Sequence, residues 1–467
     1  MPKIIIINAA TEQMSGGQLS AAQRDLAAKA SLRSLWFANA GDIVIMPVEV
    51  DHGVLDYMSE VLGTDLRKVH MIVPPGCDQF ALCDEHLLTR GVISELRDIV
   101  TSGGTWIIDP CYHTRGVVDL AAEIGVASPP GSGFAAQGGC DILNRKSHFR
   151  QLAIGAQLPI AAGSVAADAN MLANAIERHL SATGTVIVKK DNGAAGAGNI
   201  TITTGDTEPL PGARETLKAG RDLHEMARRL WADLTDAWSH DVVVEAYHAA
   251  THKFYLEYLI DEDGRFRFLN SGAVRFRPDE DPSATELVWG GLDLPGDLPA
   301  FACASVLNLA ARFITLAAQI GYRGPINIDG IITDTNEIIF NEVNARWGGC
   351  SVLHYLGERL LGPQYANRHA VSSLREVECP PLPQLVERLR EHGLAFDPET
   401  RRGAIALASD ARASSIVEFV LMAPDFAQVR ELERAIYHAL EQSVPPEAPV
   451  VLPVSFGPPH AAQQVSP

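Results

Sequence analysis

The chain has 467 residues, a length that predicts about three domains at roughly 150 residues each. Charged residues make up 20% and hydrophobic residues 46%, an ordinary globular balance that excludes a mainly disordered or collagen-like chain. The net charge is −19, so the long-range field repels phosphates and disfavours a nucleic acid or an anionic membrane as a partner. A local phosphate pocket remains compatible with this charge.

The apolar runs and the cysteines indicate the cellular compartment. No uninterrupted apolar run of about 18 residues appears, so we expect no membrane span, and the apolar run at residues 4–7 is too short for a signal peptide. The seven cysteines are scattered without a CxxC pair, which indicates neither a disulfide framework nor a structural zinc site. We therefore expect a cytoplasmic protein with free thiols.

Residues 1–135 alternate short apolar runs with amphipathic stretches. The apolar runs cover residues 3–8, 43–48, 69–74 and 105–109, and amphipathic stretches cover residues 21–37 and 87–100. Near-continuous apolar strands separated by helices are typical of a parallel sheet that is covered on both faces. We predict a small Rossmann-like α/β domain. It has no GxGxxG after its first strand, so dinucleotide binding is not supported.

Two further units follow, and both have mixed α+β patterns. For residues 136–378 we expect helices at 146–156, 222–236 and 299–320, strands at 185–189, 199–203, 241–246, 254–260 and 266–274, and a hairpin at 326–343. For residues 379–467 we expect a small α+β domain with helices at 384–391 and 425–440, strands at 403–408 and 415–422, and a proline-rich tail.

The most informative motif is the expected hairpin at residues 327–346. It reads as two strands around an Asp-Thr-Asn-Glu turn. If the strands pair symmetrically about that turn, Asp329 lies opposite Glu342 and Asn327 lies opposite Asn344. Because side chains alternate along a strand, all four then share one face.

Two carboxylates that face each other in an apolar hairpin need an explanation. Like charges directly opposed across strands are destabilising, and a hard divalent cation would remove that cost. Mg²⁺ takes oxygen ligands, usually one or two carboxylates together with substrate phosphates. We therefore predict a metal site at Asp329, Glu342 and Asn344, with an acidic pair on a solvated sheet face as the alternative.

A glycine loop follows the strand that ends at Lys189. Gly193, Gly196 and Gly198 would let backbone N–H groups approach and wrap an anion, and Lys189 could reach the same phosphate as a point charge. The GxxxxGK[ST] sequence is absent, so the loop is not a P-loop. Taken alone, the pattern is equally compatible with a plain glycine hairpin.

Two further positions suggest contacts with a nucleotide. Lys146 stands at a helix start, where it opposes the helix dipole and therefore favours a nearby anion. Glu245 ends an apolar strand just before Tyr247 and His248, where a carboxylate and backbone groups could meet an adenine edge. Each position alone is also compatible with an ordinary surface side chain.

These four features, in this order, resemble the ATP-grasp ligases over about residues 136–375. Lys146 stands thirteen residues before Pro159, and this spacing and that of the three metal-site residues are similar to those of the D-alanine–D-alanine ligases. With its N-terminal α/β domain and C-terminal unit, the whole chain looks most like the preATP-grasp peptide ligases of the pheganomycin type. The sequence Glu-Val-Asn-Ala-Arg-Trp-Gly-Gly at residues 342–349 is similar to the signature of that group.

The resemblance implies ATP with Mg²⁺, or with Mn²⁺ in its place, as cofactors. It implies an acyl phosphate on a donor carboxylate, attack by an acceptor amine, and release of ADP and phosphate, as in peptide formation for natural product biosynthesis. It assigns the ATP phosphates to Lys146 and Lys189, the covering loop to the three glycines, and adenine to Glu245 with the Tyr247 and His248 backbone. It assigns the metal to Asp329, Glu342 and Asn344, and the transferring phosphoryl group to Arg346.

The chain departs from the family pattern at two places. The D-alanine–D-alanine ligases have an arginine two residues before the metal aspartate, whereas Asn327 stands here. The role of that arginine would fall to Arg346, or to Arg275 and Arg277. The glutamate that the family has soon after the strand that contacts adenine, where it contacts ribose, has no obvious counterpart, since Thr-His-Lys occupies residues 251–253 and Glu257 comes late.

Other functions remain open. A carboxylation through carboxyphosphate is one alternative, although the chain has no Met-Lys-Met biotin-attachment sequence. A nucleotide-binding protein without activity is another, and the retained metal and lysine residues argue against it. The expected partners are a small-molecule carboxylate and an amine, such as an amino acid or a peptide, and a homodimer is left open.

Overall fold

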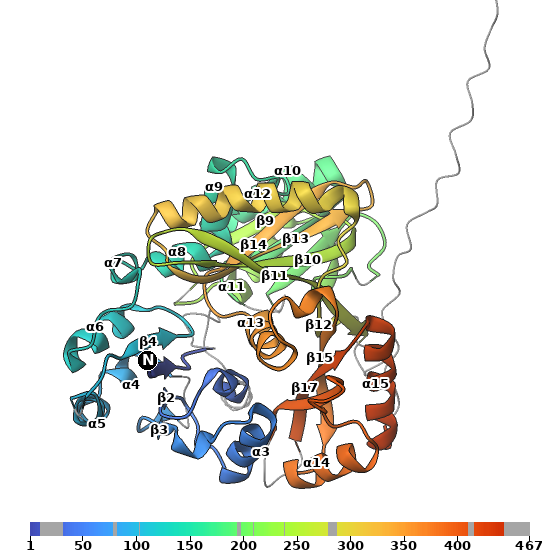
Figure 1. The fold of residues 1–467 in the computed structure, drawn as a ribbon. Coiled ribbons are helices and arrows are strands. Elements are labelled where there is room, and N and C mark those ends of the chain that lie inside the picture. The colour runs from blue at the N-terminus through green and yellow to red at the C-terminus, as the bar shows by residue number, and fades with distance from the viewer. Residues whose placement is uncertain are drawn as a thin grey trace, which may run out of the picture.

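The computed structural model contains three β-sheets with helices packed around them (Figure 1). It describes residues 1–9, 31–77, 82–101, 103–193, 198–208, 210–237, 239–278, 287–409 and 415–442, without the side chains of residues 277, 278, 287 and 288. The expected tail and residues 194–197 lie outside these ranges.

The first sheet is parallel, with the strand order β3-β2-β1-β4. Its strands are β1 (Lys3–Ile6), β2 (Ile43–Ile45), β3 (His70–Ile72) and β4 (Ile107–Pro110), and its main helices are α3 (His52–Leu62), α5 (Arg90–Val100) and α6 (Arg115–Ile124). Ile4 packs in one cluster with α5 and α6, while Ile5 packs in another with α3. Both faces are covered, which explains the continuous apolar run and confirms the Rossmann-like prediction.

The stretch at residues 21–37 is described only from residue 31. Ser31–Phe37 forms a 3₁₀ helix, η1, rather than the end of an amphipathic α-helix. Trp36 of η1 donates a hydrogen bond from Nε1 to the carbonyl oxygen of Leu407 at 2.6 Å. This contact ties the N-terminal domain to the C-terminal end of the described chain.

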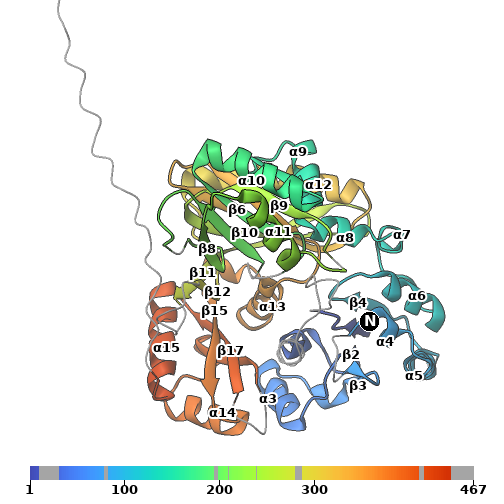
Figure 2. The ribbon, with the colours of Figure 1, turned by 180° about the vertical axis from the view of Figure 1, so that it is seen from behind.

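Short helices lead from the first domain to the second sheet. They are α7 (Ser132–Ala135), α8 (Gly139–Asn144) and α9 (Lys146–Gly155), whereas the short α4 (Asp84–Leu87) precedes α5 inside the first domain. The second sheet has the order β5-β9-β6-β7-β8, with β5 (Gly163–Ala166), β6 (Thr185–Lys190), β7 (Asn199–Thr203), β8 (Glu215–Lys218) and β9 (Val242–Ala246). Its buried face packs against α10 (Ala169–Thr183) and α11 (Leu223–Leu234), which Figure 2 shows from behind.

The third sheet has eight strands in the order β14-β13-β10-β11-β12-β15-β17-β16. The strands are β10 (Ala250–Ile260), β11 (Phe266–Pro278), β12 (Leu287–Leu294), β13 (Gly324–Thr333), β14 (Ile338–Asn344), β15 (Ala370–Cys379), β16 (Gly403–Ala408) and β17 (Ser415–Ala423). The helices are α12 (Ala300–Gln319), α13 (Gly349–Leu356), α14 (Leu382–Glu391) and α15 (Phe426–Ala439).

This large sheet extends from the expected middle domain into the expected C-terminal domain. The domain boundary near residue 378 falls inside β15, which pairs with β12 on one side and β17 on the other. The sequence analysis included neither β12 nor β15. In β15 a pair of serines, a charged Arg-Glu pair and a register shift between Leu374 and Val377 break the apolar alternation that would have revealed a strand.

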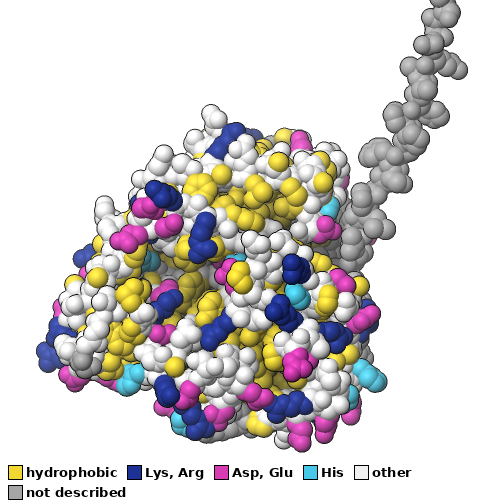
Figure 3. Space-filling view, in the orientation of Figure 1, with side chains coloured by type: hydrophobic (Ala, Val, Ile, Leu, Met, Phe, Trp, Pro, Cys, Tyr) yellow, Lys and Arg dark blue, Asp and Glu magenta, His cyan; other side chains and the backbone are white. Residues whose placement is uncertain are grey.

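Among the described residues, α12 is the one helix that is long and apolar enough by composition to span a membrane. Val306, Ala310 and Phe313 on this helix are buried in a cluster that includes Phe254 and Leu256 of β10. This burial is what a core helix of the large sheet requires. In the orientation of Figure 1 the surface is hollowed between the N-terminal domain and the rest of the molecule, and charged side chains gather around the hollow (Figure 3).

Candidate active site

A pocket of about 480 Å³ brings together the five-stranded sheet, the start of α9 and the β13–β14 hairpin of the large sheet. It contains nine residues to which the sequence analysis gave a binding or catalytic role, because elements far apart in the chain converge here. These residues are Lys146, Lys189, Glu245, Tyr247, His248, Asp329, Glu342, Asn344 and Arg346.

The hairpin has the register that its sequence predicts. Asp329 pairs with Glu342 and Asn327 pairs with Asn344, and all four residues line the pocket. The register then shifts, so that Gly330 pairs with Phe340 and Asn341 is left without a partner in the ladder. This bulge brings Asn341 into the pocket lining as well, which simple alternation does not predict.

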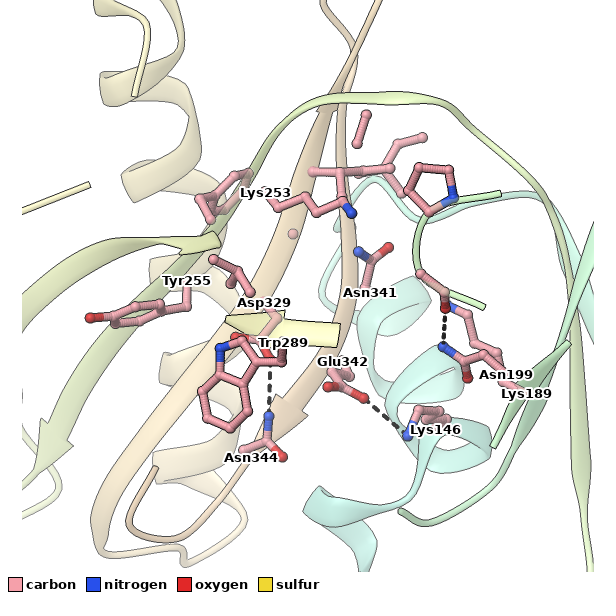
Figure 4. Close-up of a pocket in the computed structure, with 18 of the residues that line it drawn as sticks. Lys146, Lys189, Asn199, Lys253, Tyr255, Trp289, Asp329, Asn341, Glu342 and Asn344 are labelled. Atoms are coloured by element: carbon pink, nitrogen blue, oxygen red, sulfur yellow. Dashed lines mark hydrogen bonds and ion pairs between the residues drawn. The ribbon is translucent and has the colours of Figure 1, made fainter. Parts of the chain in front are cut away.

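The two opposed carboxyl groups have different partners (Figure 4). Asp329 Oδ2 accepts a hydrogen bond from Asn344 Nδ2 at 3.1 Å, whereas Glu342 Oε2 lies 3.0 Å from Lys146 Nζ. Burial and the charge of Glu342 raise the pKa of Asp329 well above its usual value. Burial also opposes ionisation of Glu342, but the charge and hydrogen bond of Lys146 hold the pKa of Glu342 below its usual value. The carboxyl pair is therefore short of positive charge.

Oxygen ligands for a hard cation are present at this pair. No group of three or more His, Cys, Asp or Glu side chains placed to hold a metal occurs in the described part of the chain. Two carboxylates with one amide nevertheless fit Mg²⁺, since this ion commonly takes one or two carboxylates and completes its shell with phosphates and water. The raised pKa of Asp329 is a cost of burial and of the neighbouring carboxylate that such an ion would remove.

The start of α9 is held by Asp191, which follows β6. Asp191 is fully buried, its Oδ1 accepts a hydrogen bond from the Ser147 backbone N–H at 2.7 Å, and its carbonyl oxygen accepts one from the Lys146 N–H at 2.9 Å. These contacts satisfy N–H groups that a helix start leaves free, and the carboxylate suits the helix dipole. Lys146 is thereby positioned relative to the strand that carries Lys189.

Glu245 lies between two cations rather than facing open space. Its carboxylate is 2.5 Å from Lys189 Nζ and also pairs with Arg150, and the residue is 4% exposed. Burial opposes its ionisation, but the charges of Lys189 and Arg150 hold the pKa of Glu245 below its usual value. The sequence analysis missed Arg150, although it stands four residues after Lys146 and therefore on the same face of α9.

The glycine loop is described only at its ends. Gly193 has φ 139°, and its carbonyl oxygen lies 3.5 Å from Lys146 Nζ, whereas Gly196 lies outside the described residues. A Cβ at Gly198 would come within 2.6 Å of the Lys190 Cβ, so this position excludes other residues unless the strand moves. The loop therefore begins beside Lys146 and ends beside Lys190, the residue that follows Lys189.

The structure distinguishes among the three arginines that were predicted to contact the transferring phosphoryl group. Arg346 lines the pocket and donates a hydrogen bond to Asn144 Oδ1. Arg275 is not part of the pocket lining, and its Nη2 lies 2.8 Å and 2.9 Å from the two carboxylate oxygens of Glu433 on α15. The side chain of Arg277 lies outside the described residues. Of these arginines, Arg346 is thus the one that the structure places at the opposed carboxyl pair.

Several pocket residues had no recognisable signal in the sequence. Arg33 reaches the pocket from η1 of the N-terminal domain, and its Nη2 lies 3.4 Å from the Gly349 carbonyl oxygen. Lys253, Tyr255 and Trp289 come from β10 and β12. Long-range contacts of this kind depend on how the sheets pack, so local patterns do not reveal them.

Comparison with known proteins supports this architecture. A family model described as the Pre ATP-grasp domain matches residues 31–126, and one described as the PGM1 C-terminal domain matches residues 384–436. No curated protein sequence was found to match the chain.

Solved structures resemble the chain over most of its length. The ADP complex of N5-carboxyaminoimidazole ribonucleotide synthetase has a TM-score of 0.54 and 12% identity, and the match covers 94% of this chain and 96% of that chain. Biotin carboxylase from Campylobacter jejuni has a TM-score of 0.56 and 14% identity, with 94% and 91% covered. The biotin carboxylase domain of 2-oxoglutarate carboxylase from Hydrogenobacter thermophilus has a TM-score of 0.54 and 13% identity, with 93% and 89% covered.

These likenesses extend through all three sheets, and the matching family model accounts for most of the first domain. The chain therefore matches the Pre ATP-grasp family at residues 31–126 and, over most of its length, has the fold of these synthetase and carboxylase structures.

Proposed function

We propose that the chain is an ATP-dependent carboxylate–amine ligase that joins amino acids or peptides through an acyl phosphate. One observation carries this proposal: a single pocket contains the opposed Asp329 and Glu342 carboxyl groups together with Lys146, Lys189 and Arg346. Phosphoryl transfer needs mainly positioning and charge stabilisation, and this set of side chains supplies both. Among the ATP-grasp ligases, the closer likeness to preATP-grasp peptide ligases of the pheganomycin type stays a prediction.

Each side chain has a distinct role in this proposal. Asp329, Glu342 and Asn344 would hold Mg²⁺ or Mn²⁺, which would offset the phosphate charge when bound. Lys146 and Lys189 bind the ATP phosphates, while the Gly193–Gly198 loop covers them and excludes water. Residues 246–248 line the part of the pocket in which adenine would bind. Glu245, next to them, orients Lys189 through its ion pair.

The proposed reaction has two steps. A donor carboxylate oxygen attacks the γ-phosphorus of ATP, ADP leaves, and an acyl phosphate forms. The acceptor amine then attacks the acyl carbon, phosphate leaves, and the amine gives up a proton. Arg346 is placed to hold the phosphoryl or acyl oxygen as charge develops, since its planar fork suits such groups.

The large sheet also contributes apolar and aromatic side chains to the pocket. Tyr255, Val274, Phe276 and Trp289 line it. An apolar or aromatic side chain on the donor or acceptor would bury its surface here. We also propose that the enzyme works in the cytoplasm on small molecules, and that a homodimer is an assembly to test.

A second candidate is carboxylation through carboxyphosphate. It is favoured by the structural likeness to a carboxyaminoimidazole ribonucleotide synthetase and to biotin carboxylases. In that case bicarbonate, rather than an amino acid, would be the phosphate acceptor.

A screen of purified protein with ATP, Mg²⁺ and pools of amino acids, with and without bicarbonate, distinguishes these functions. The ligase should release ADP and phosphate and form an amide that mass spectrometry detects. Release of AMP and pyrophosphate would refute the acyl-phosphate mechanism. ADP release that requires bicarbonate would favour carboxylation, and ATP binding without any substrate-dependent ADP would indicate a binding protein.

A further inference from the structure

Lys253 lies on β10 in the wall of the pocket, and the proposed reaction gives it no role. Its side chain is half-buried, and its Nζ lies 3.8 Å from the centroid of the Phe276 ring. Both residues belong to the large sheet, and both line the pocket.

The partners of the pocket's basic side chains set Lys253 apart. Four of them are paired with carboxylates of the chain, namely Arg33 with Glu418, Lys146 with Glu342, Lys189 with Glu245 and Arg214 with Asp233. Arg346 instead donates a hydrogen bond to the side-chain oxygen of Asn144. Across the described ranges, the Lys253 ammonium has no carboxylate within ion-pair distance and faces an aromatic ring instead. Its counter-charge is therefore missing from this part of the chain.

A partly buried ammonium without a counter-charge carries a free-energy cost. Burial lowers the pKa of Lys253 to about 8, which reports that cost. The ring face of Phe276 attracts the cation but offsets only part of the lost hydration. An anion that enters the pocket would remove the remaining cost, because it supplies the missing charge.

A second polar group lies next to Lys253. In Figure 4 the Lys253 side chain points toward Asn341, the residue that the β14 bulge leaves outside the strand register. The Asn341 amide can donate two hydrogen bonds, so an ammonium and an amide face the same part of the pocket. Neighbouring Glu342 is engaged separately by Lys146.

We propose that Lys253 and Asn341 form an anion-binding pair that holds a phosphate or carboxylate oxygen of a bound ligand. The proposal rests on the proposed function in one respect: ATP and the acid substrate are the anions expected in this pocket. Lys253 is a binding residue in this assignment, and it acts alongside Lys146, Lys189 and Arg346.

The test compares the wild-type protein with Lys253→Met, Lys253→Arg and, as a matched control, Lys218→Met on the exposed side of β8. Calorimetry measures the affinity for adenosine, Mg·ADP and inorganic tripolyphosphate. The KM of the best acid from the substrate screen is measured for the same proteins. Lys253→Met should keep or raise the thermal stability, since it removes an unpaired buried charge.

Two results support the pair and identify its ligand. If the pair holds a phosphate, Lys253→Met weakens ADP and tripolyphosphate binding about tenfold or more, spares adenosine, and is partly rescued by Lys253→Arg. If it holds the substrate carboxylate, nucleotide affinities stay unchanged and the KM of the acid rises about tenfold.

Affinities and KM within about twofold of the Lys218→Met control would overturn the pair. A wild-type protein that binds ADP and loses affinity with Lys253→Met, yet never turns over an acid, would refute the ligase function and leave the pair standing. A wild-type protein that binds neither ADP nor tripolyphosphate and is not saturated by any acid would overturn both.

Discussion

The two carboxylate clusters of the pocket differ in the sign of the charge that they leave unbalanced. At the hairpin, Asp329 and Glu342 share one cation, Lys146, whereas Glu245 lies between two cations, Lys189 and Arg150. Counting only groups within ion-pair distance and taking each as ionised, the first cluster carries −1 and the second +1, and the charge of Arg346 acts on the first cluster from farther away. The first suits a metal ion and the second suits a phosphate, so one pocket can hold a metal–nucleotide complex although the whole chain is acidic.

We expect the largest effect from a mutation in the first cluster, Asp329 and Glu342 with Lys146. Glu342→Gln removes a proposed metal ligand and the ion-pair partner of Lys146, so we expect turnover to fall about 100- to 1,000-fold with the fold retained. ADP release measures the loss. Glu337→Gln, an exposed change in the turn of the same hairpin, is the control and should leave turnover unchanged. Equal activity of the two variants would dismiss the metal assignment.

Mutation of the second cluster, Glu245 with Lys189 and Arg150, should lower the stability of the protein. Glu245→Gln leaves Lys189 and Arg150 buried without a carboxylate, so we expect the free energy of unfolding to fall by about 3 kcal/mol. Denaturant unfolding followed by circular dichroism measures the change. Glu215→Gln on the exposed edge strand β8 should cost little. A loss below about 1 kcal/mol would show that the buried pairs do not hold the strands together.

Mutation of Arg346 should affect mainly activity, whereas mutation of Arg275 should affect mainly stability. Arg346→Met should lower turnover about tenfold to 100-fold with little change in melting temperature, because Arg346 faces the opposed carboxyl pair. Arg275→Met should lower the free energy of unfolding by about 1–2 kcal/mol and spare turnover, because Arg275 ties β11 to Glu433 of α15. Loss of turnover in Arg275→Met with unchanged stability would reverse this assignment.

The smallest expected effect is an opposite pH dependence of the two clusters. The pKa of Glu245 is lowered on folding, so its stabilisation is present above the unfolded pKa and is lost as pH falls through the folded one. The pKa of Asp329 is raised, so its contribution is present below the unfolded pKa and is lost as pH rises through the folded one. Each pKa unit is worth about 1.4 kcal/mol.

Unfolding measured across pH in Asp329→Asn and Glu245→Gln checks these signs. Asp329→Asn should remove the decline toward higher pH, and Glu245→Gln should remove the decline toward acid. The same sign of pH dependence in both variants would contradict the charge difference between the clusters.

Local patterns identified the elements that build the site. The hairpin register was predictable because a short turn determines how two adjacent strands pair, and the observed pairs of Asp329 and Asn327 agree with it. The helix that begins at Lys146 and the strand that ends near Lys189 were predictable for the same reason, since periodicity and end signals lie within a few residues. The bulge at Asn341 was not predictable from the sequence. A regular register and a bulged register place the same residues in β14, so the sequence pattern does not distinguish them.

The sequence by itself therefore determined the α/β and α+β character of the chain, the opposed carboxyl groups and several charged residues of one pocket. Only the tertiary structure decided that Glu245 is held by Lys189 and Arg150, that Arg275 binds α15, that β15 joins the large sheet, and that Lys253 faces no carboxylate in the described chain. Pairing within a hairpin depends on neighbours in the chain. The partner of a buried charge depends on which distant elements pack against it, and that choice is made by the sheets as a whole.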